Sequence, residues 1–178
     1  MLPIVQLGDP VLRQVARPLA ANELVSLGDL VDEMRETMRA APGVGLAAPQ
    51  IGRSIQLAVI EDPPQRHDQL SAEELAARER AAVPFHVIVN PKLTIVGDEV
   101  VDAYEGCLSF EGFVMIVRRA HRVRVDAIDE HGKAVSIEAT GWYARILQHE
   151  IDHLNGIVCC DRMDPRTLAT TANHRRFG

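Results

Sequence analysis

The stretch "TGWYARILQHEIDHLNG", residues 140–156, predicts a helix with almost no face left for solvent. Apolar side chains recur along it at helical spacing, and a second stripe carries His149, Glu150 and His153. The apolar stripe consists of Ala144, Leu147, Ile151 and Leu154. The leading threonine is a typical N-cap, and the closing Asn-Gly pair is a typical stop. Because so much of its surface is apolar, we expect this helix to lie buried inside a domain.

Other patterns predict the elements that surround this helix. Residues 22–40 repeat apolar side chains at helical spacing, which indicates an amphipathic helix that ends at "APG". Short β-branched runs predict strands at 55–60, 85–89, 93–96 and 114–117. The alternating runs 122–128 and 133–139, separated by "DEHG", indicate a hairpin with one solvent-facing side. We therefore expect an α+β fold, in which mostly antiparallel strands form small mixed sheets around a central buried helix that carries "HEIDH".

Length and composition indicate how the chain is organised. With 178 residues, 47% of them hydrophobic, the chain is long enough for one sizeable core, so we expect a single domain over residues 1–178. The polar segment 61–84 is expected to be a surface insertion with a short helix, because Ser71 and Glu74 are spaced as a capping box. Residues 166–178 are expected to form a C-terminal tail.

Charge and cysteine usage exclude several classes of protein. The formal net charge of −6 disfavours a broad surface for nucleic acid, so no sequence-specific nucleic-acid binding is expected. The basic end "NHRRFG" (173–178) is the one place for a transient contact with the ribosome, although arginines at a frayed terminus are commonly just solvated. No apolar run approaches about 18 residues and no signal peptide is visible, which predicts a cytoplasmic protein without a membrane span. Three cysteines, an odd number, argue against a disulfide scaffold.

The two histidines of the buried helix can share one metal ion. His149 and His153 are four residues apart, so both rings face one side of a helix. The spacing alone does not decide this, because two such histidines can also simply hydrogen-bond to carbonyl groups. A zinc peptidase would need a third ligand after the helix, where Asp161, Asp164 and His174 are the candidates. None of them lies on an evident second helix or in an "HxxGxxH" extension, so a third ligand upstream is worth seeking.

An upstream cysteine is the candidate for that third ligand. In "YEGCLSF" (104–110), Cys107 follows Gly106 in a segment that alternation places at a sheet edge. A lone cysteine is usually a buried structural residue. A thiolate with two imidazoles, however, makes a three-ligand set that leaves a fourth position open for water, as in catalytic metal sites. Cys159 and Cys160 follow the helix too closely to fold back on the ion, so we expect them to serve in packing.

A glycine-rich stretch, "GVGLAAPQIG" (43–52), fits two interpretations. It matches a dinucleotide-binding pattern, but that pattern needs a strand before it and a helix after it, and here the order is reversed. The stretch also lacks the ending of a phosphate-binding P-loop. It is either a tight turn between a helix and a strand or a loop that brings backbone groups and one amide side chain to a substrate.

Taken together, "GVGLAAPQ", "EGCLS" and "QHEIDH" resemble, in this order, the three signature motifs of peptide deformylases, which remove the N-formyl group from the initiator methionine of new polypeptides. The similarity extends from "LGDPVLRQVARP" (7–18) to "GIVCCDRMDP" (156–165). The aspartate within "HEIDH" also matches this family better than most zinc peptidases. The resemblance implies a metal-dependent hydrolase that acts on N-formyl-Met nascent peptides.

Carried over by position, the resemblance implies a role for each motif residue. The implied metal ligands are Cys107, His149 and His153. Glu150 handles protons, while Gln50 and the backbone N–H of Leu108 face the oxyanion. Gly45 pairs its backbone with the bound peptide. The positions that the resemblance assigns to substrate binding are Val44, Gly45, Glu105, Gly106, Arg119, Trp142, Arg145 and Ile146.

The chemistry of the reaction is consistent with these roles. A formamide is a poor electrophile, so the metal has to lower the pKa of its water and polarise the formyl oxygen. A carboxylate next to a ligand can take a proton from that water and return it to the departing amine, and amide donors at the oxyanion strengthen as charge develops. A thiolate with two imidazoles suits Fe²⁺, Zn²⁺, Ni²⁺ or Co²⁺. The resemblance favours Fe²⁺ as the native ion, with zinc a common but poorer occupant.

The chain also departs from the family pattern beside the cysteine. Phe110, Glu111 and Gly112 stand where most relatives have an apolar residue, proline and glycine or glutamate, and Arg118 replaces a proline. These positions bear on substrate preference and rate more than on the type of reaction. Two alternatives remain: a small zinc peptidase, which would be indifferent to the cysteine, and a non-catalytic peptide-binding relative, which would not need the catalytic glutamate and glutamine.

Overall fold

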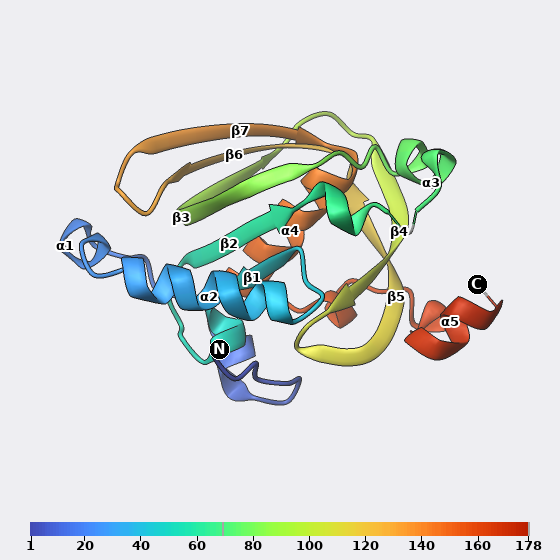
Figure 1. The fold of residues 1–178 in the computed structure, drawn as a ribbon, viewed down its shortest axis with the longest axis horizontal. Coiled ribbons are helices and arrows are strands. Elements are labelled where there is room, and N and C mark those ends of the chain that lie inside the picture. Colours follow the sequence, from blue (N-terminus) through green and yellow to red (C-terminus); the bar gives the residue numbers. More distant parts are fainter. Residues whose placement is uncertain (69, 178) are drawn as a thin grey trace.

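The computed structural model describes residues 1–68 and 70–177, so Gln69 of the segment 61–84 and Gly178 of the C-terminal tail lie outside the described residues. The chain forms two antiparallel sheets with the strand orders β1-β2-β3-β6-β7 and β4-β5-β8 (Figure 1). The strands are β1 (Gly45–Ala47), β2 (Leu57–Asp62), β3 (Val83–Ile95), β4 (Val100–Cys107), β5 (Phe110–Ala120), β6 (Arg122–Ile128), β7 (Ala134–Thr140) and β8 (Ala169–Thr170). The helices are α1 (Ala21–Leu24), α2 (Gly28–Ala40), α3 (Ala72–Ala77), α4 (Gly141–Leu154) and α5 (Thr171–Phe177). The expected α+β class is confirmed.

The two faces of the larger sheet bury different helices. Ala58 and Ile60 of β2 belong to the core cluster that contains the apolar stripe of α4. Leu57 and Val59 belong to the cluster that contains the buried face of α2. Because successive side chains of a strand point to opposite faces, α4 covers one face of the sheet and α2 covers the other (Figure 1).

Helix α4 is the predicted helix of residues 140–156, and ten of its fourteen residues are buried. It contacts strands of both sheets. The helix ends at Leu154 with Asn155 as its C-cap, and Gly156 has a φ of 72°, a conformation that glycine adopts without strain. Thr140 occupies the N-cap position, but its side chain does not accept a capping hydrogen bond from the first turn of the helix. Instead, the backbone N–H of Trp142 donates to the Arg78 carbonyl at 2.9 Å.

The segment 61–84 therefore does more than cover the surface. It contains α3 with the expected capping box between Ser71 and Glu74. Its ends, however, are part of the larger sheet, since residues 61–62 complete β2 and residues 83–84 begin β3. The prediction of a surface insertion is wrong for these ends. The segment also lies close to the start of α4, where a Cβ at Gly141 would lie 2.5 Å from Cβ of Glu79.

Two element boundaries differ from the predictions. The helix expected over 22–40 is split into α1 and α2, because the Ser26 hydroxyl donates to the Glu23 carbonyl and so competes with continued helix bonding. The strands expected at 85–89 and 93–96 form one strand, β3, with a register shift between Val89 and Lys92. Asn90 has a positive φ of 50° and forms a bulge here, so the strand continues with a shifted register.

Other strands confirm or extend the predictions. The hairpin of 122–128 and 133–139 is present as β6 and β7, which pair from Arg122–Thr140 to Ile128–Ala134. Strand β4 and the short β1 were not predicted as strands, although the edge position expected for the Cys107 segment is confirmed, since β4 is an edge strand of its sheet.

The C-terminal tail is more ordered than a frayed end. Strand β8 pairs with β5, and α5 follows it, with the His174 ring tilted against the Tyr104 ring at 4.1 Å between centroids. Within residues 1–68 and 70–177, no helix has the length and hydropathy that a membrane crossing needs. That residues 1–178 form a single domain remains a prediction.

Candidate metal centre and substrate cleft

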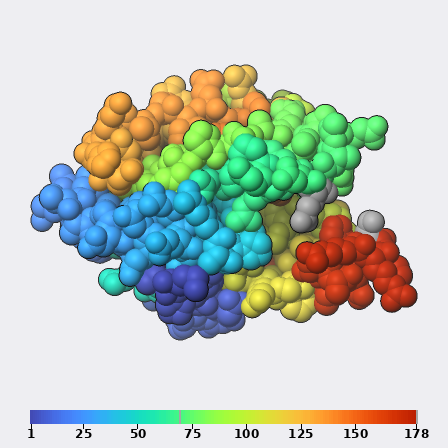
Figure 2. All heavy atoms as spheres, in the orientation of Figure 1, coloured from blue at the N-terminus to red at the C-terminus, as the bar shows by residue number. Residues whose placement is uncertain are grey.

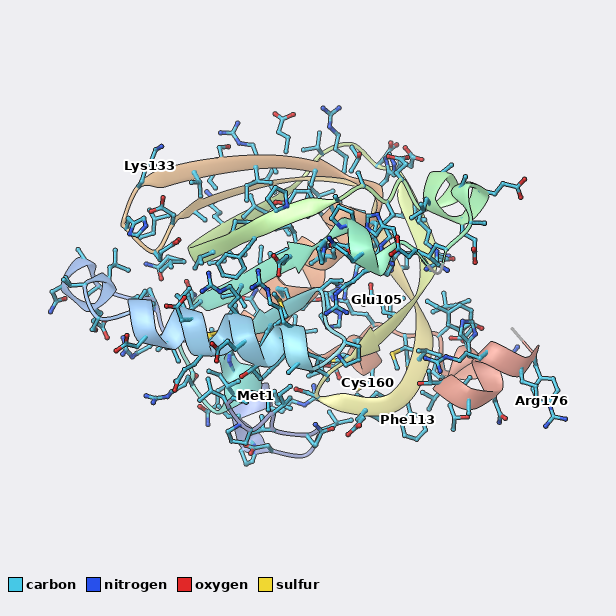
Figure 3. All side chains as sticks on the ribbon, viewed as in Figure 1. Met1, Glu105, Phe113, Lys133, Cys160 and Arg176 are labelled. Atoms are coloured by element: carbon cyan, nitrogen blue, oxygen red, sulfur yellow. The ribbon has the colours of Figure 1, made fainter. Side chains whose placement is uncertain are left out.

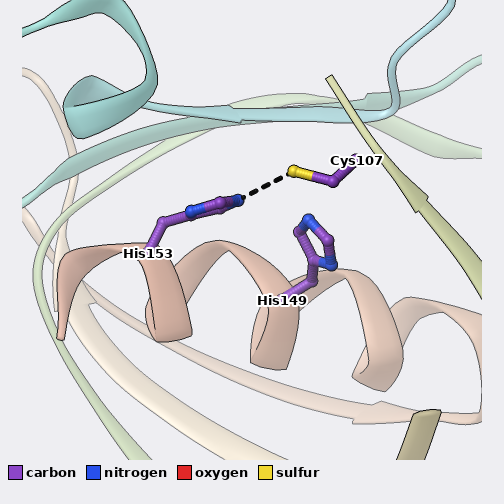
Figure 4. Close-up of side chains that lie close together, drawn as sticks. All are labelled: Cys107, His149 and His153. Atoms are coloured by element: carbon purple, nitrogen blue, oxygen red, sulfur yellow. Dashed lines mark hydrogen bonds between the residues drawn. The ribbon is translucent and has the colours of Figure 1, made fainter. Parts of the chain in front are cut away.

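Three side chains from two elements meet between α4 and β4 (Figure 4). Cys107 ends β4, whereas His149 and His153 lie one turn apart on α4. One potential ligand atom of each lies within 4.8 Å of the other two, and Cys107 Sγ is 3.3 Å from His153 Nε2. The β4–β5 ladder shifts register at Gly106–Cys107. A shift of this kind re-aims a side chain, here the cysteine that faces the helix.

The chemistry of these three groups fits a divalent transition metal. Burial holds the pKa of His153 well below its usual range, so its imidazole is neutral, as a metal ligand has to be. The adjacent Cys159 thiol and burial both raise the pKa of Cys107, so a cation is needed to stabilise the thiolate. Three ligands leave one tetrahedral position open, which is typical of a catalytic ion.

A buried carboxylate on β4 orients His149. Glu105 Oε2 lies 2.9 Å from His149 Nδ1, which leaves Nε2 of that ring for the metal. Burial alone would raise the pKa of Glu105, but hydrogen bonds from His149 and Arg119 outweigh it and hold the pKa well below its usual range. In turn, this carboxylate outweighs burial at His149 and raises the pKa of the imidazole to about 9.

Arg119 connects Glu105 to the ligand helix. Its Nε and Nη2 donate to the two carboxylate oxygens of Glu105 at 2.9 and 3.0 Å. Its Nη1 donates to Asp152 of α4, which also accepts two hydrogen bonds from Arg162. Alternating ion pairs thus join Glu105, Arg119, Asp152 and Arg162. Among these four side chains, only Arg162 is exposed.

Glu150 lies beside the ligands in a different environment. Its residue is 4% exposed, and its Oε2 has no hydrogen-bond partner among the described residues. Burial raises the pKa of Glu150 to about 7. Gly45 of β1 faces this side chain closely, because a Cβ at that position would lie 2.5 Å from Cδ of Glu150. Only glycine lets the β1 backbone approach the carboxylate in this way.

Gln50 is held with its amide nitrogen toward the cysteine. It lies in a 3-10 turn, Ala48–Ile51, and its Oε1 accepts from the backbone N–H of Ala47 at 2.8 Å. Its Nε2 donates to Ser109 Oγ at 3.3 Å and faces Cys107 Sγ at 3.6 Å. The sequence interpretation missed Ser109, whose signal was its place in the quoted "EGCLS" motif. The glycine-rich stretch is therefore a strand and a turn that bring an amide to the site.

One cleft of about 1160 Å³ is lined by Gln50, Glu105, Cys107, His149 and Glu150. Figure 2 shows the hollow, with the cyan-to-green segment that follows α2, the yellow strands and the red C-terminal helix around it. Strands β1 and β4 are edge strands of different sheets, and both contribute residues to the cleft wall. Two sheet edges are thus available to an extended chain placed between them.

The structure places most of the predicted substrate-binding residues at this cleft. The residues that line it are Val44, Gly45, Glu105, Gly106, Trp142, Arg145 and Ile146, together with Leu108, Phe110, Glu111 and Gly112. Arg119 is not among them and is buried in its ion pairs, so the expectation that it binds substrate needs correction. The unusual residues after the cysteine motif do reach the cleft, which is consistent with an effect on substrate preference.

The cysteine and the candidate ligands that follow α4 lie outside the ligand cluster. Cys159 packs in a cluster with Met115 and Val117, against Cys107, so the expected packing role holds but the expected distance from the site does not. It is not part of the ligand-atom cluster. The candidate ligands of a zinc peptidase are engaged elsewhere: Asp161 with Arg13, Asp164 at a 3-10 turn, and His174 on the tail helix.

Comparison with known proteins agrees with this geometry. The family model described as polypeptide deformylase matches residues 1–169. The chain belongs to the polypeptide deformylase family. It is 48% identical over 170 residues to "Peptide deformylase 3" of Streptomyces avermitilis, a match that covers 95% of this chain and 74% of that protein.

Solved structures of deformylases share the fold. A class I type b peptide deformylase from Acinetobacter baumannii, determined with Met-Ala-Ser bound, has a TM-score of 0.80 at 34% identity, and the match covers 92% of this chain and 98% of that one. A peptide deformylase from Synechococcus elongatus in complex with actinonin has a TM-score of 0.77 at 37% identity, covering 93% and 80%. The chain is accordingly a metal-dependent hydrolase that deformylates N-formyl-methionyl nascent peptides.

Proposed function

We propose that the deformylase reaction of this chain is carried out by the groups that converge between α4 and β4. Cys107, His149 and His153 hold one divalent ion. Glu150 acts as the general base and acid. The observation that supports this assignment most strongly is Glu150 itself, a buried carboxylate next to His149 whose Oε2 has no hydrogen-bond partner among the described residues.

Each group has a defined task in this proposal. When bound, the ion supplies Lewis acidity toward water and the formyl oxygen. Glu150 takes a proton from the attacking water and returns it to the amine that leaves, and its pKa of about 7 suits both steps near neutral pH. The amide of Gln50 and the backbone N–H of Leu108 donate to the developing oxyanion.

The substrate is proposed to lie as an extended peptide between β1 and β4. Gly106 of β4 is exposed in the cleft, and Gly45 presents the backbone of β1 on the other side. The apolar side chains of Val44, Trp142 and Ile146 offer a surface for the methionine side chain. The Acinetobacter structure, which contains the tripeptide Met-Ala-Ser, supports a product-like peptide in the corresponding cleft.

We propose Fe²⁺ as the native ion, with Zn²⁺, Ni²⁺ and Co²⁺ as possible substitutes. One thiolate and two imidazoles accept all four ions, so the donor set alone does not choose among them. Metal analysis of protein purified without oxygen tests this choice. A cytoplasmic location, a transient ribosome contact through residues 173–178 and the absence of sequence-specific nucleic-acid binding remain predictions.

Formate release tests the proposed function directly. Protein purified without oxygen should release formate from formyl-Met-Ala-Ser, lose this activity with a chelator, and regain it when Fe²⁺ is restored. Hydrolysis of an unformylated peptide bond serves as the control and should not be detected. Formate release that persists after complete removal of the metal would refute the metal-assisted mechanism.

A further inference from the structure

Arg145 lies on α4 one helical turn before His149 and is only 4% exposed. Its Nη1 donates to Glu105 Oε1 at 2.7 Å and to the Val117 carbonyl at 2.7 Å. Its Nη2 donates to the Val101 carbonyl at 2.6 Å. A single side chain of the histidine helix is therefore bonded to β4, the strand that ends in the metal cysteine, and to its neighbour β5.

Charge neutralisation does not explain this arrangement. Arg119 already gives Glu105 a two-point ion pair, so the carboxylate has a cationic partner without Arg145. Burial lowers the pKa of Arg145, which shows that the guanidinium is desolvated at a cost. Two of its three acceptors are backbone carbonyls that carry no net charge. What Arg145 adds is a set of short, directional bonds between α4 and the two strands.

Three of the five guanidinium N–H groups are engaged within the protein. Both hydrogens of Nη1 and one hydrogen of Nη2 are used in these bonds. Glu105, which these bonds help to fix, lies near the middle of the molecule, whereas Lys133 and Arg176 lie at its periphery (Figure 3). Although Arg145 borders the cleft, its hydrogen bonds go to the carboxylate behind His149 and to backbone carbonyls of β4 and β5.

We infer that Arg145 is a positioning residue of the metal site, which holds the cysteine strand against the histidine helix and keeps Glu105 on His149 Nδ1. It fixes the relative placement of ligands that come from two separate elements. Its loss should therefore weaken and distort metal binding without changing the affinity for the formylated peptide. This inference rests on the proposed ligand set of Cys107, His149 and His153.

Two other roles make different predictions. If Arg145 contacts the substrate, its removal raises KM and leaves metal affinity unchanged. If it only stabilises the fold, its removal lowers the melting temperature, but the folded protein binds metal as before. Metal affinity, the spectrum of the bound ion and KM together separate the three roles.

The experiment uses the full chain with Arg145→Met, which preserves an apolar stem of similar length, and Arg145→Lys. Chelator competition gives the Kd for Co²⁺, and absorption of the Co²⁺-loaded protein reports the coordination geometry and the thiolate bond. For Arg145→Met we expect Kd to rise on the order of 10-fold to 100-fold, the usual effect of losing a group behind a metal ligand. The Co²⁺ spectrum should change, while KM for formyl-Met-Ala-Ser at saturating metal should not.

Arg145→Lys retains the charge but cannot make all three bonds, so its Kd should fall between those of the wild type and Arg145→Met. If Arg145→Met fails to fold, the lysine variant carries the test, with a raised Kd and an altered spectrum expected. Arg118→Met is the matched control, since Arg118 is the adjacent, exposed arginine, and its side-chain hydrogen bonds among the described residues join β5 to β4 through Asp102. It should bind Co²⁺ as the wild type does.

The outcome separates this inference from the proposed function. A wild-type Kd and spectrum in both Arg145 variants, or a raised KM with unchanged metal binding, would overturn the positioning role. Cys107→Ala, measured in parallel, should lose high-affinity Co²⁺ binding. If Cys107→Ala kept it, the ligand set itself would be wrong, whatever the Arg145 variants show.

Discussion

Replacement of Gly45 by alanine tests whether the position of the Glu150 carboxylate controls the reaction. A Cβ at residue 45 would lie 2.5 Å from Cδ and 2.8 Å from Cγ of Glu150, and it would overlap Oε1. Ordinary van der Waals contact begins at 3.4 Å, so the carboxyl group has to move by roughly 1 Å. A displacement of about 1 Å at a reacting group can cost on the order of 10² in rate. We expect a fall in kcat of that size.

The metal should remain in this variant, because the three atoms nearest to the added methyl group all belong to Glu150 and not to a ligand. The assay is formate release from formyl-Met-Ala-Ser at saturating metal, with the metal content of the same sample measured by elemental analysis. Gly106→Ala is the control, since a Cβ there would meet nothing closer than 3.7 Å. It should keep the metal and kcat, and it should raise KM if the peptide lies along β4.

A double variant makes the test of Gly45 sharper. Gly45→Ala should add little to the defect of Glu150→Gln, because both changes act through one carboxylate and their effects are then not additive. Full additivity, or an unchanged kcat with the metal retained, would contradict the claim that Gly45 serves to place Glu150. Loss of the metal in Gly45→Ala would show instead that β1 supports the ligands.

Four further predictions concern the ligands and the catalytic carboxylate. Cys107→Ala should remove metal and activity, while Cys159→Ala, which changes a packing residue, should leave both nearly intact by elemental analysis and formate release. Glu150→Gln should retain metal but lower turnover by a factor on the order of 10² or more, and unchanged turnover would remove Glu150 from the mechanism. The pKa of Glu150 is raised to about 7 in the folded state, so the free energy of unfolding of metal-free protein should fall by up to about 3 kcal/mol as pH rises from about 4.5 through 7. Denaturant unfolding measures this free energy at each pH, and Glu150→Gln should lack this part of the pH dependence. The Fe²⁺ form should lose activity in air as Cys107 is oxidised while the Zn²⁺ form persists, which turnover against time and mass spectrometry of the Cys107 peptide will show; equal lifetimes with Cys107 unmodified would contradict this.

The parts of the fold that depend on local periodicity could be predicted from the sequence. The apolar stripe and the end signals of residues 140–156 predicted the extent and burial of α4, and alternation predicted the β6–β7 hairpin. The interruption of α2 and the continuity of β3 could not be predicted in this way. Both depend on a single polar residue, Ser26 or Asn90, whose hydrogen bonds or backbone angle override the surrounding pattern.

The same distinction between local pattern and long-range contact applies to the residues of the site. Residue type and helical spacing identified the histidine pair, and chemistry favoured Cys107 as its partner. Contacts between distant segments remained invisible, because they require the register of the sheets. Gly45 was assigned to peptide pairing, but its contact with Glu150, 105 positions away, also demands a glycine. Arg119 does not line the cleft, because the β4–β5 register places it opposite Val101, where its side chain reaches Glu105.

The two buried glutamates of the site explain how one residue type serves two tasks. Glu105 accepts hydrogen bonds from Arg119, Arg145 and His149, and those from His149 and Arg119 hold its pKa low, so it is a fixed negative charge. Glu150 is equally buried, but Oε2 has no donor among the described residues, and burial raises its pKa to about 7. Groups whose surroundings push their pKa values apart in this way take different roles in acid–base chemistry. For this reason we assign orientation of the metal ligand to Glu105 and proton transfer to Glu150.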